Sequence, residues 1–219
     1  RAQEKDRVEA EGVDVMEWSE ALAEHGDLIE EKFGSVVDPQ RDYLTALSTA
    51  LFSAGTVIYV PEGVDAEDVK IRTRMNSQSL FNYTLVVAEE SSSVTILERQ
   101  TTGQDVDGKR YYSGIVEVDA AENASVQYGA LQNLSEETYN FSVKRGHADT
   151  YATVDWIEGN IGSRLTRSDI ETELNGDSSE SKIVGAFFGH DDQHFDVNAR
   201  VWHQAEHTTA DLVTRGVLD

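Results

Sequence analysis

The feature that most constrains the fold is a regular series of short strand-like runs in the second half of the chain. Their centres follow one another at intervals of about 12 to 16 residues, with no helical period between them. The centres lie near Ile115, Tyr128, Ser142, Val154, Ser168, Val184, Asn198 and Thr214. Evenly spaced strands of this kind are typical of a β-sandwich, a closed β-barrel or a β-solenoid.

Two observations favour the β-solenoid. Hairpin dipeptides are few: Asp107-Gly108 lies in a polar loop, and only Asn175-Gly176 suits a genuine hairpin turn. The runs also resemble one another in length and pattern. We therefore predict a mainly β protein with a solenoid core, in which each rung buries one face against its neighbours and the ends need caps.

The stretch Arg167 to Asp196 contains two of these runs, joined by a polar turn at Asn175 to Ser179. Ile170, Thr172 and Leu174 alternate with Asp169, Glu171 and Glu173, which predicts a strand with one buried face. The run Lys182 to Phe188 is apolar at successive positions. We therefore expect this second strand to be covered on both faces.

Residues 1–55 have a helical pattern and are expected to form an N-terminal segment that caps a core at residues 56–219. An amphipathic segment runs from Val15 to Phe33, with a break at Gly26. A second helix is expected to start with Asp38 as its cap and Pro39 in its first turn. Its apolar face is expected to contain Tyr43, Leu44, Leu47, Leu51 and Phe52.

From Thr56 onward, strand-like runs replace the helical period. The first four are expected at residues 56–60, 69–73, 81–88 and 94–98. The polar, glycine-flanked segment Gly103 to Lys109 is the best candidate for a mobile loop.

The chain is strongly acidic, with a formal charge of −23 and a pI near 4.4. This charge argues against nucleic acid or an anionic membrane as a partner, because both carry negative charge. Acidic residues are spread along the whole chain between ordinary hydrophobic strands. We interpret this pattern as salt adaptation of a folded protein, since high salt screens the self-repulsion.

The sequence contains no run of about 18 apolar residues and no signal-peptide pattern, which favours a soluble cytoplasmic protein. It contains no cysteine, so these residues hold no disulfide, cysteine nucleophile or thiolate ligand. We expect no metal or cofactor to be bound by this chain alone.

Histidines form the first candidate site. His190 and His194 are four residues apart, as are His203 and His207, and on a helix each pair could chelate one ion. The local pattern is strand and turn, however, where positions four apart lie about 13 Å from each other. We therefore prefer surface or strand-packing histidines, and we keep a histidine-based metal-binding protein as an alternative.

Clustered carboxylates form the second candidate. Asp191, Asp192 and Asp196 suggest a β-solenoid enzyme acting on polysaccharides, because such enzymes use paired carboxylates as acid and base. In so acidic a chain an Asp pair is weak support, and we keep this enzyme only as an alternative. Four aromatic residues are expected in the core rather than on a ligand platform: Trp156, Phe187, Phe188 and Trp202. Trp202 falls opposite Val197, Ala199 and Val201, so an interface anchor is the alternative for this residue.

Three stretches carry a family resemblance: YVPEGV at 59–64, YNFSVKRG at 139–146, and the segment from Ser168 that includes GHDDQHFD and HTTADLVTRGVLD. Together they resemble the SufB/SufD family of iron–sulfur cluster assembly proteins from about Tyr59 to the end. DQHFD, followed by His203 and His207-Thr208, is more similar to the SufD type. The missing cysteine agrees with that assignment.

The resemblance implies a right-handed parallel β-helix preceded by helices, and a non-enzymatic scaffold role. It implies pairing with a SufB-like subunit through the β-helices and binding of a SufC-like ATPase, with a homodimer as another assembly. The iron–sulfur cluster would then be held at the level of the complex. The family's segment that contacts the ATPase lies beyond Asp219, so we expect a fragment and assign no catalytic, cofactor-binding or metal-binding residue.

Overall fold

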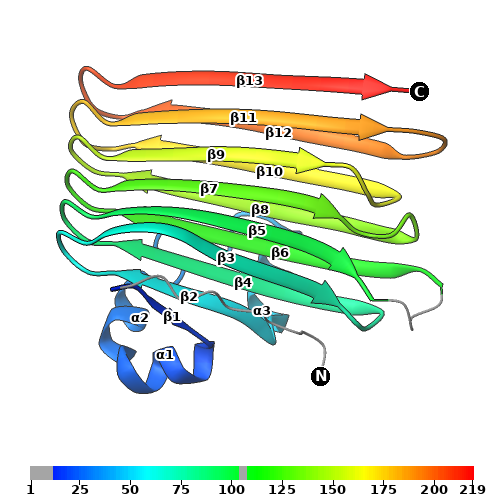
Figure 1. Ribbon diagram of the computed structural model, residues 1–219, viewed down its shortest axis with the longest axis horizontal. Coiled ribbons are helices and arrows are strands. Elements are labelled where there is room, and N and C mark those ends of the chain that lie inside the picture. The colour runs from blue at the N-terminus through cyan, green and yellow to red at the C-terminus, as the bar shows by residue number, and fades with distance from the viewer. Residues whose placement is uncertain (1–11, 104–107) are drawn as a thin grey trace.

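The structure is a computed structural model that describes residues 12–103 and 108–219. Within these ranges, successive strands alternate between two sheets, which stack rung upon rung (Figure 1). The seven-stranded sheet has the order β1-β2-β4-β6-β8-β10-β12, and the six-stranded sheet has the order β13-β11-β9-β7-β5-β3. All pairings are parallel except that of β1 with β2. The predicted parallel β-solenoid is confirmed.

The strands are long enough to span a full side of each rung. In the seven-stranded sheet they are β1 (Asp14–Met16), β2 (Ala54–Val60), β4 (Ser79–Ala88), β6 (Arg110–Ala120), β8 (Thr138–Ala148), β10 (Leu165–Leu174) and β12 (His194–His203). In the six-stranded sheet they are β3 (Asp65–Met75), β5 (Ser93–Thr102), β7 (Ser125–Asn133), β9 (Thr153–Asn160), β11 (Glu180–Gly189) and β13 (Thr209–Leu218). Residues 104–107 of the loop expected at Gly103 to Lys109 lie outside the described residues.

One corner of each rung has a residue in the left-handed region. These residues recur about every 29 positions as Ser91, Asn123, Tyr151, Ser178 and His207, with φ between 57° and 59°. The amide of each of the first four donates to a carbonyl in the next rung, as from Ser91 to Glu122 at 2.9 Å. The left-handed conformation is costly for residues other than glycine, so this stacking imposes strain at every corner.

The interior between the two sheets is apolar along one side and polar along the other. The apolar side contains fully buried residues such as Ile58, Val86, Val118 and Trp156. On the polar side, the buried carboxylate of Glu98 accepts hydrogen bonds from Thr73, Gln100 and Tyr128 at 2.8 to 3.0 Å. These contacts give the buried Glu98 carboxylate the hydrogen bonds that a charged group in the interior requires.

A second polar contact of the interior is an ion pair. Lys144 pairs with Glu158, and each side chain is 4 % exposed. The hydroxyl of Ser168 donates to Glu158 at 2.7 Å. Burial by itself raises the pKa of Glu158, but the Lys144 ammonium and these hydrogen bonds outweigh it and hold the pKa below its usual value.

The N-terminal segment contains α1 (Trp18–Glu24), α2 (Gly26–Lys32) and α3 (Tyr43–Leu51), which cover part of the seven-stranded sheet. The break at Gly26 is confirmed, but Asp14–Met16 forms β1 and pairs with β2, which the expected helix from Val15 did not allow for. The predicted start of the second helix at Asp38 is wrong. Asp42 caps α3, because its carboxylate accepts from the amides of Leu44 and Thr45, both at 2.9 Å.

The predicted apolar face of α3 is wrong for Tyr43, Leu47 and Leu51, which are exposed, whereas Phe52 at the end of the helix packs against the core as expected. The helix packs through the buried small residues Thr45 and Ser48, and the Ser48 hydroxyl contacts that of Ser113 on β6 at 2.5 Å. Small side chains allow this close approach to the sheet. Tyr43, at 94 % exposed, and Leu51, at 50 %, face outward instead.

Glu117 on β6 fixes the loop between α2 and α3. Its carboxylate accepts from the amides of Gly34, Val36 and Val37 at 2.7 to 3.0 Å, and from the Tyr83 hydroxyl at 2.6 Å. Burial, followed by the neighbouring Glu117 charge, raises the pKa of Tyr83. This single buried side chain therefore holds the N-terminal segment against the solenoid.

The hairpin expected at Asn175-Gly176 is not formed, because β10 and β11 belong to different sheets. The amides of both residues donate to the Ala148 carbonyl of the preceding rung. A Cβ on Gly176 would lie 1.8 Å from the backbone nitrogen of Thr150. Glycine is therefore required here so that two corners can stack, not for a hairpin.

Two expectations about strand faces also change. Glu171 of β10, expected on an exposed face, is buried at 1 % because other parts of the chain cover it. In contrast, the outer face of β11 is open: Phe188 is 53 % exposed, although Ile183 on the inner face is 1 % exposed. Burial of an outward face therefore depends on which segment packs over it.

Candidate docking surfaces

The two histidine pairs lie at opposite ends of β12, which begins at His194 and ends at His203. A strand of that length separates its ends by about 30 Å. His190 lies 3.7 Å from a Glu136 carboxylate oxygen, and Nδ1 of His203 is 2.6 Å from the Thr208 hydroxyl. Across the described part of the chain, no three His, Cys, Asp or Glu side chains are grouped as for a metal ion.

The carboxylates of the second candidate site are exposed and directed to different partners. Asp192 pairs with Arg164 at 3.4 Å, and Asp196 pairs with Arg167 at 3.9 Å. Asp191 occupies a corner with φ 52°, in contact with His190 at 3.1 Å. The structure does not bring the three together around a common cleft.

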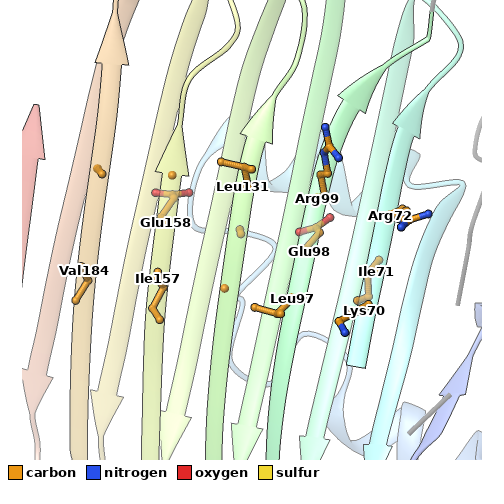
Figure 2. Close-up of a pocket in the computed structure, with 14 residues that line it drawn as sticks. Lys70, Ile71, Arg72, Leu97, Glu98, Arg99, Leu131, Ile157, Glu158 and Val184 are labelled. Carbon is orange, nitrogen blue, oxygen red and sulfur yellow. The ribbon is translucent and has the colours of Figure 1, made fainter. Parts of the chain in front are cut away.

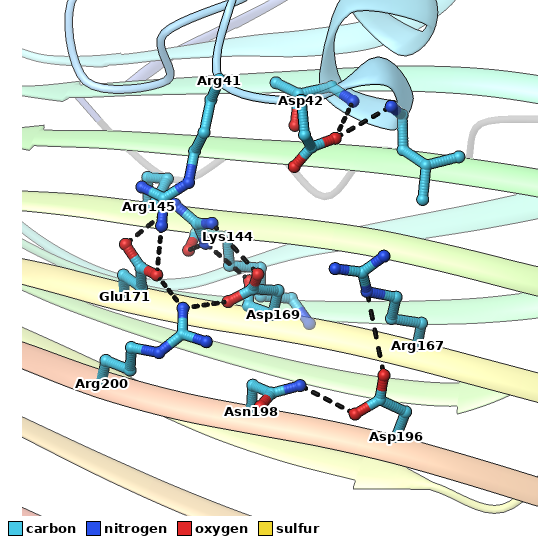
Figure 3. Close-up of polar contacts among 12 residues, drawn as sticks. Arg41, Asp42, Lys144, Arg145, Arg167, Asp169, Glu171, Asp196, Asn198 and Arg200 are labelled. Atoms are coloured by element: carbon cyan, nitrogen blue, oxygen red, sulfur yellow. Dashed lines mark hydrogen bonds and ion pairs between the residues drawn. The ribbon is translucent and has the colours of Figure 1, made fainter.

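The structure instead brings together a network of arginine and carboxylate side chains on the outer face of β8, β10 and β12 (Figure 3). Arg145, Glu171 and Arg200 occupy the same register position on the three strands. Arg41 joins them from the N-terminal segment, with Nη2 2.5 Å from Oε1 of Glu171. Arg200 pairs with the same oxygen and lies 3.5 Å from Asp169.

The buried part of this network is strongly charged. The side chains of Glu171 and Arg145 are 2 % and 5 % exposed, and Arg145 donates to the Asp169 backbone carbonyl at 2.8 Å. Burial raises the pKa of Glu171, but the guanidinium groups of Arg145, Arg200 and Arg41 outweigh it and lower the pKa overall. The network joins three rungs to the N-terminal segment.

Trp202 lies beside this network on the outer face. Its side chain is 48 % exposed and its indole nitrogen is 3.4 Å from Glu171. Of the aromatic residues expected in the core, Trp156 is 1 % exposed, but the expectation is wrong for Phe188 and Trp202, which lie on outer faces of the sheets. Trp202 is therefore available to a partner, whereas Trp156 is not.

A groove of about 500 Å³ lies on the other side of the molecule, along the outer face of the six-stranded sheet (Figure 2). Its apolar walls include Leu97, Leu131 and Ile157, which are 41 to 45 % exposed. Gly129 and Gly159 form hollows between these side chains. Lys70, Arg72 and Arg99 line the end of the groove at β3 and β5.

The sequence pointed to the outer face that continues through Trp202 and His207 as a docking surface, but it did not identify the charged network or the groove. The network and the groove each consist of residues about one rung apart, so they align only when the register between rungs is known. The rung corners carry different residue types, such as Ser91, Asn123 and Tyr151, so the sequence gives no direct signal for that register. In the described residues, no helix is long and apolar enough to cross a membrane.

The sequence was compared with protein-family models and with known proteins. A family model described as the SufBD core domain of SUF system iron–sulfur cluster assembly matches residues 71–219, and one for the SufBD N-terminal region matches residues 1–71. The chain is 30 % identical to the iron–sulfur cluster assembly protein SufB of Bacillus subtilis over 97 % of its own length. It is 29 % identical to a SufBD family protein of Staphylococcus epidermidis over 96 % of its length.

In both comparisons the chain covers 46 % of the relative. It therefore spans about half the length of the curated relatives it matches. The core match extends over most of the solenoid, from β3 through β13. The chain belongs to the SufB/SufD family of iron–sulfur cluster assembly proteins.

Proposed function

We propose that this chain is a non-enzymatic, SufD-type scaffold subunit that pairs with a SufB-like subunit and a SufC-like ATPase. The observation that carries this proposal is the match of the SufBD core to the solenoid, residues 71–219. The cluster is cargo of the assembled complex. Because these 219 residues contain no cysteine, thiolate ligands for the cluster have to come from outside them.

The SufD-type assignment rests on the residues that follow β11. DQHFD at 192–196, together with His203 and His207-Thr208, has the order of the SufD type. The solenoid supplies a stiff body whose rungs are held in register by parallel pairing. The arginine and carboxylate network also joins that body to the N-terminal segment.

We place the SufB-like partner at the outer face of β12, around Trp202. A large, half-exposed aromatic residue beside charged groups is the composition that dominates binding energy at many interfaces. Trp202 has this exposure, and its neighbour Arg200 lies at the edge of the charged network.

The test is co-expression of the tagged chain with the SufB-like and SufC-like subunits of the same organism, followed by anaerobic cluster reconstitution. We expect a ternary complex that holds a cluster, while the chain alone holds none in stoichiometric amount. Trp202→Ala should weaken co-purification of the SufB-like subunit by about tenfold or more. Tyr43→Ala, which removes an exposed aromatic side chain on α3, is the matched control and should have no effect.

Two results would oppose this proposal. A stoichiometric cluster on the isolated chain would contradict the accessory role. Hydrolysis of an acidic polysaccharide that is lost in Asp192→Asn would indicate an enzyme instead.

A further inference from the structure

Two of the rows of outward side chains on the six-stranded sheet run across the strands and define the groove; the neighbouring row, which contains Asp155 and Asp211, lies outside it. The pairing register places Lys70, Leu97, Gly129, Ile157, Val184 and Val213 in the first row. It places Arg72, Arg99, Leu131, Gly159, Ala186 and Arg215 in the second. Neither row contains an aspartate or glutamate, in a chain that has 41 of them against 18 lysines and arginines.

Gly129 and Gly159 determine the shape of the apolar floor of the groove. Gly129 lies between Leu97 and Ile157 in the first row, and Gly159 follows Leu131 in the second. A Cβ at Gly129 would lie 3.0 Å from Leu97, and one at Gly159 would lie 3.0 Å from Leu131. Leu97 and Leu131 therefore lean close to the two glycines. Because Gly129 and Gly159 line the groove without side chains, its floor is lower there, and these two low points are called the hollows.

The length of the apolar floor across the strands suits a short helix. Adjacent strands lie about 4.8 Å apart, so β5, β7, β9 and β11 span about 14 Å. That span equals about ten residues of α-helix, and successive apolar residues on one helix face recur every 5 to 6 Å or so. An apolar stripe on a helix would thus match the spacing of the strands and fill the hollows between them.

The charged side chains at one end of the groove indicate which kind of helix would bind there. Lys70 and Arg72 on β3, with Arg99 on β5, are exposed at one end of the groove. Two carboxylates, Glu98 and Glu158, lie beneath the floor, but their side chains are buried in the interior and 3 % and 5 % exposed. The exposed charged side chains that line the groove, here called the cationic rim, are therefore all basic, although the chain as a whole is strongly anionic.

We propose that this groove binds an amphipathic helix of a partner protein, with apolar side chains along one face and acidic side chains at one end. The apolar stripe fills the hollows at Gly129 and Gly159, and the carboxylates pair with the cationic rim. This mode of recognition is helix-in-groove binding with electrostatic selection. It does not depend on the role proposed for Trp202, which lies on the other sheet.

The experiment measures fluorescence anisotropy of a labelled peptide with the intact chain. The probe has about 14 residues, with leucines on one helical face and glutamates in its first turn, where carboxylates also favour the helix. The control probe has lysines in place of the glutamates. We expect the acidic peptide to bind at least about tenfold more tightly at 0.1 M salt, and this preference to shrink at about 1 M.

Two variants locate the binding site. Arg72→Glu combined with Arg99→Glu should reverse the preference for the acidic peptide, whereas Lys109→Glu, a charge reversal outside the groove, should not. Gly159→Val should weaken both peptides by filling a hollow. Ile157→Glu, at a side chain that is 45 % exposed, tests the same point if the valine variant does not fold.

Three results would overturn the proposal. They are absence of binding, equal binding of the acidic and basic peptides at low salt, and binding that Ile157→Glu leaves unchanged. Concentration-dependent self-association that Ile157→Glu abolishes and that the acidic peptide does not displace would assign the groove to a second copy of this chain instead.

Discussion

Replacing Lys144 with methionine should destabilise the solenoid strongly at neutral pH and much less in acid. The substitution keeps the approximate volume of the side chain but leaves Glu158 buried without its cation. Removing one partner of a buried ion pair typically costs about 3 to 5 kcal/mol. That is a large part of the roughly 5 to 15 kcal/mol that stabilises a typical domain.

The loss of stability in Lys144→Met should decrease as the pH falls. In the unmodified protein the pKa of Glu158 is lowered, so its stabilising contribution is present above the unfolded pKa of about 4.3 and is lost as the pH falls through the folded value. In Lys144→Met, burial without the ammonium should raise that pKa. The variant then avoids a buried charge by taking up a proton, so its deficit should shrink between pH 7 and pH 4.

The assay is urea unfolding of both proteins at several pH values and constant salt, where other titrating groups affect both alike. Lys144→Met combined with Glu158→Gln should recover most of the loss at pH 7, because no buried charge remains and Ser168 keeps a partner. A deficit below about 1 kcal/mol at pH 7, or one that is equal at pH 4 and pH 7, would refute this reasoning.

Four further outcomes are expected. Glu117→Gln should cost about 2 to 3 kcal/mol and shift the Trp18 emission, because the amide cannot accept all the hydrogen bonds that the carboxylate accepts. Tyr151→Gly should raise the free energy of unfolding by up to about 1 kcal/mol by relieving a left-handed corner. The hydrogen bond to Asp119 raises the pKa of His147, so its stabilising effect is present below about pH 6.5 and should be lost as the pH rises through the raised folded value; urea unfolding of His147→Gln should show this. We also propose that the melting temperature rises between about 0.1 and 1 M KCl, because the Debye length falls from about 10 to 3 Å.

Each of these outcomes has a matched control. Glu137→Gln removes an exposed carboxylate and should be neutral. Tyr151→Phe keeps the corner strain and should give no gain. Gln127→Ser changes an exposed side chain that does not titrate and should leave the pH dependence of stability unaltered. A melting temperature that is independent of KCl would contradict salt adaptation as the reason for the charge of −23.

The solenoid was predictable because its signal is local. In β7, Val126, Tyr128 and Ala130 alternate with Gln127 and Gly129, and this period of two directly gives the inner face. The similar length of successive runs favoured stacking over hairpins. These properties depend on neighbouring residues and need no knowledge of distant contacts.

In the N-terminal segment, the start and the buried side of α3 could not be predicted from the local sequence. Asp38 and Asp42 are both suitable helix caps. In the structure the Asp42 carboxylate accepts from the amides of Leu44 and Thr45 and caps α3, whereas Asp38 accepts from the amide of Gln40 in the preceding turn. The buried side of α3 is the one where Ser48 contacts Ser113 of β6. Helical periodicity alone cannot identify which side of such a helix is buried.

The candidate surfaces could be located only from the register between the rungs. Arg145, Glu171 and Arg200 are far apart in sequence and become neighbours only through parallel pairing. In the same way, Gly129 and Gly159 are unremarkable singly and form the groove only when aligned with Leu97 and Leu131. The two histidine pairs are close in sequence, but they lie at opposite ends of β12.

The stacked corners also imply how the chain folds. Each strand pairs with the strands one rung before and after it, as Ser125 pairs with Ser93 and with Thr153, so the sequence separation between partners stays nearly constant along the molecule. Loop-closure entropy is then similar for every added rung, and folding can spread from any formed pair of rungs as a one-dimensional growth process. Partial unfolding should begin at the ends of the stack, and β8 and β9, where Lys144 and Glu158 join the two sheets across the interior, should exchange their amide hydrogens last.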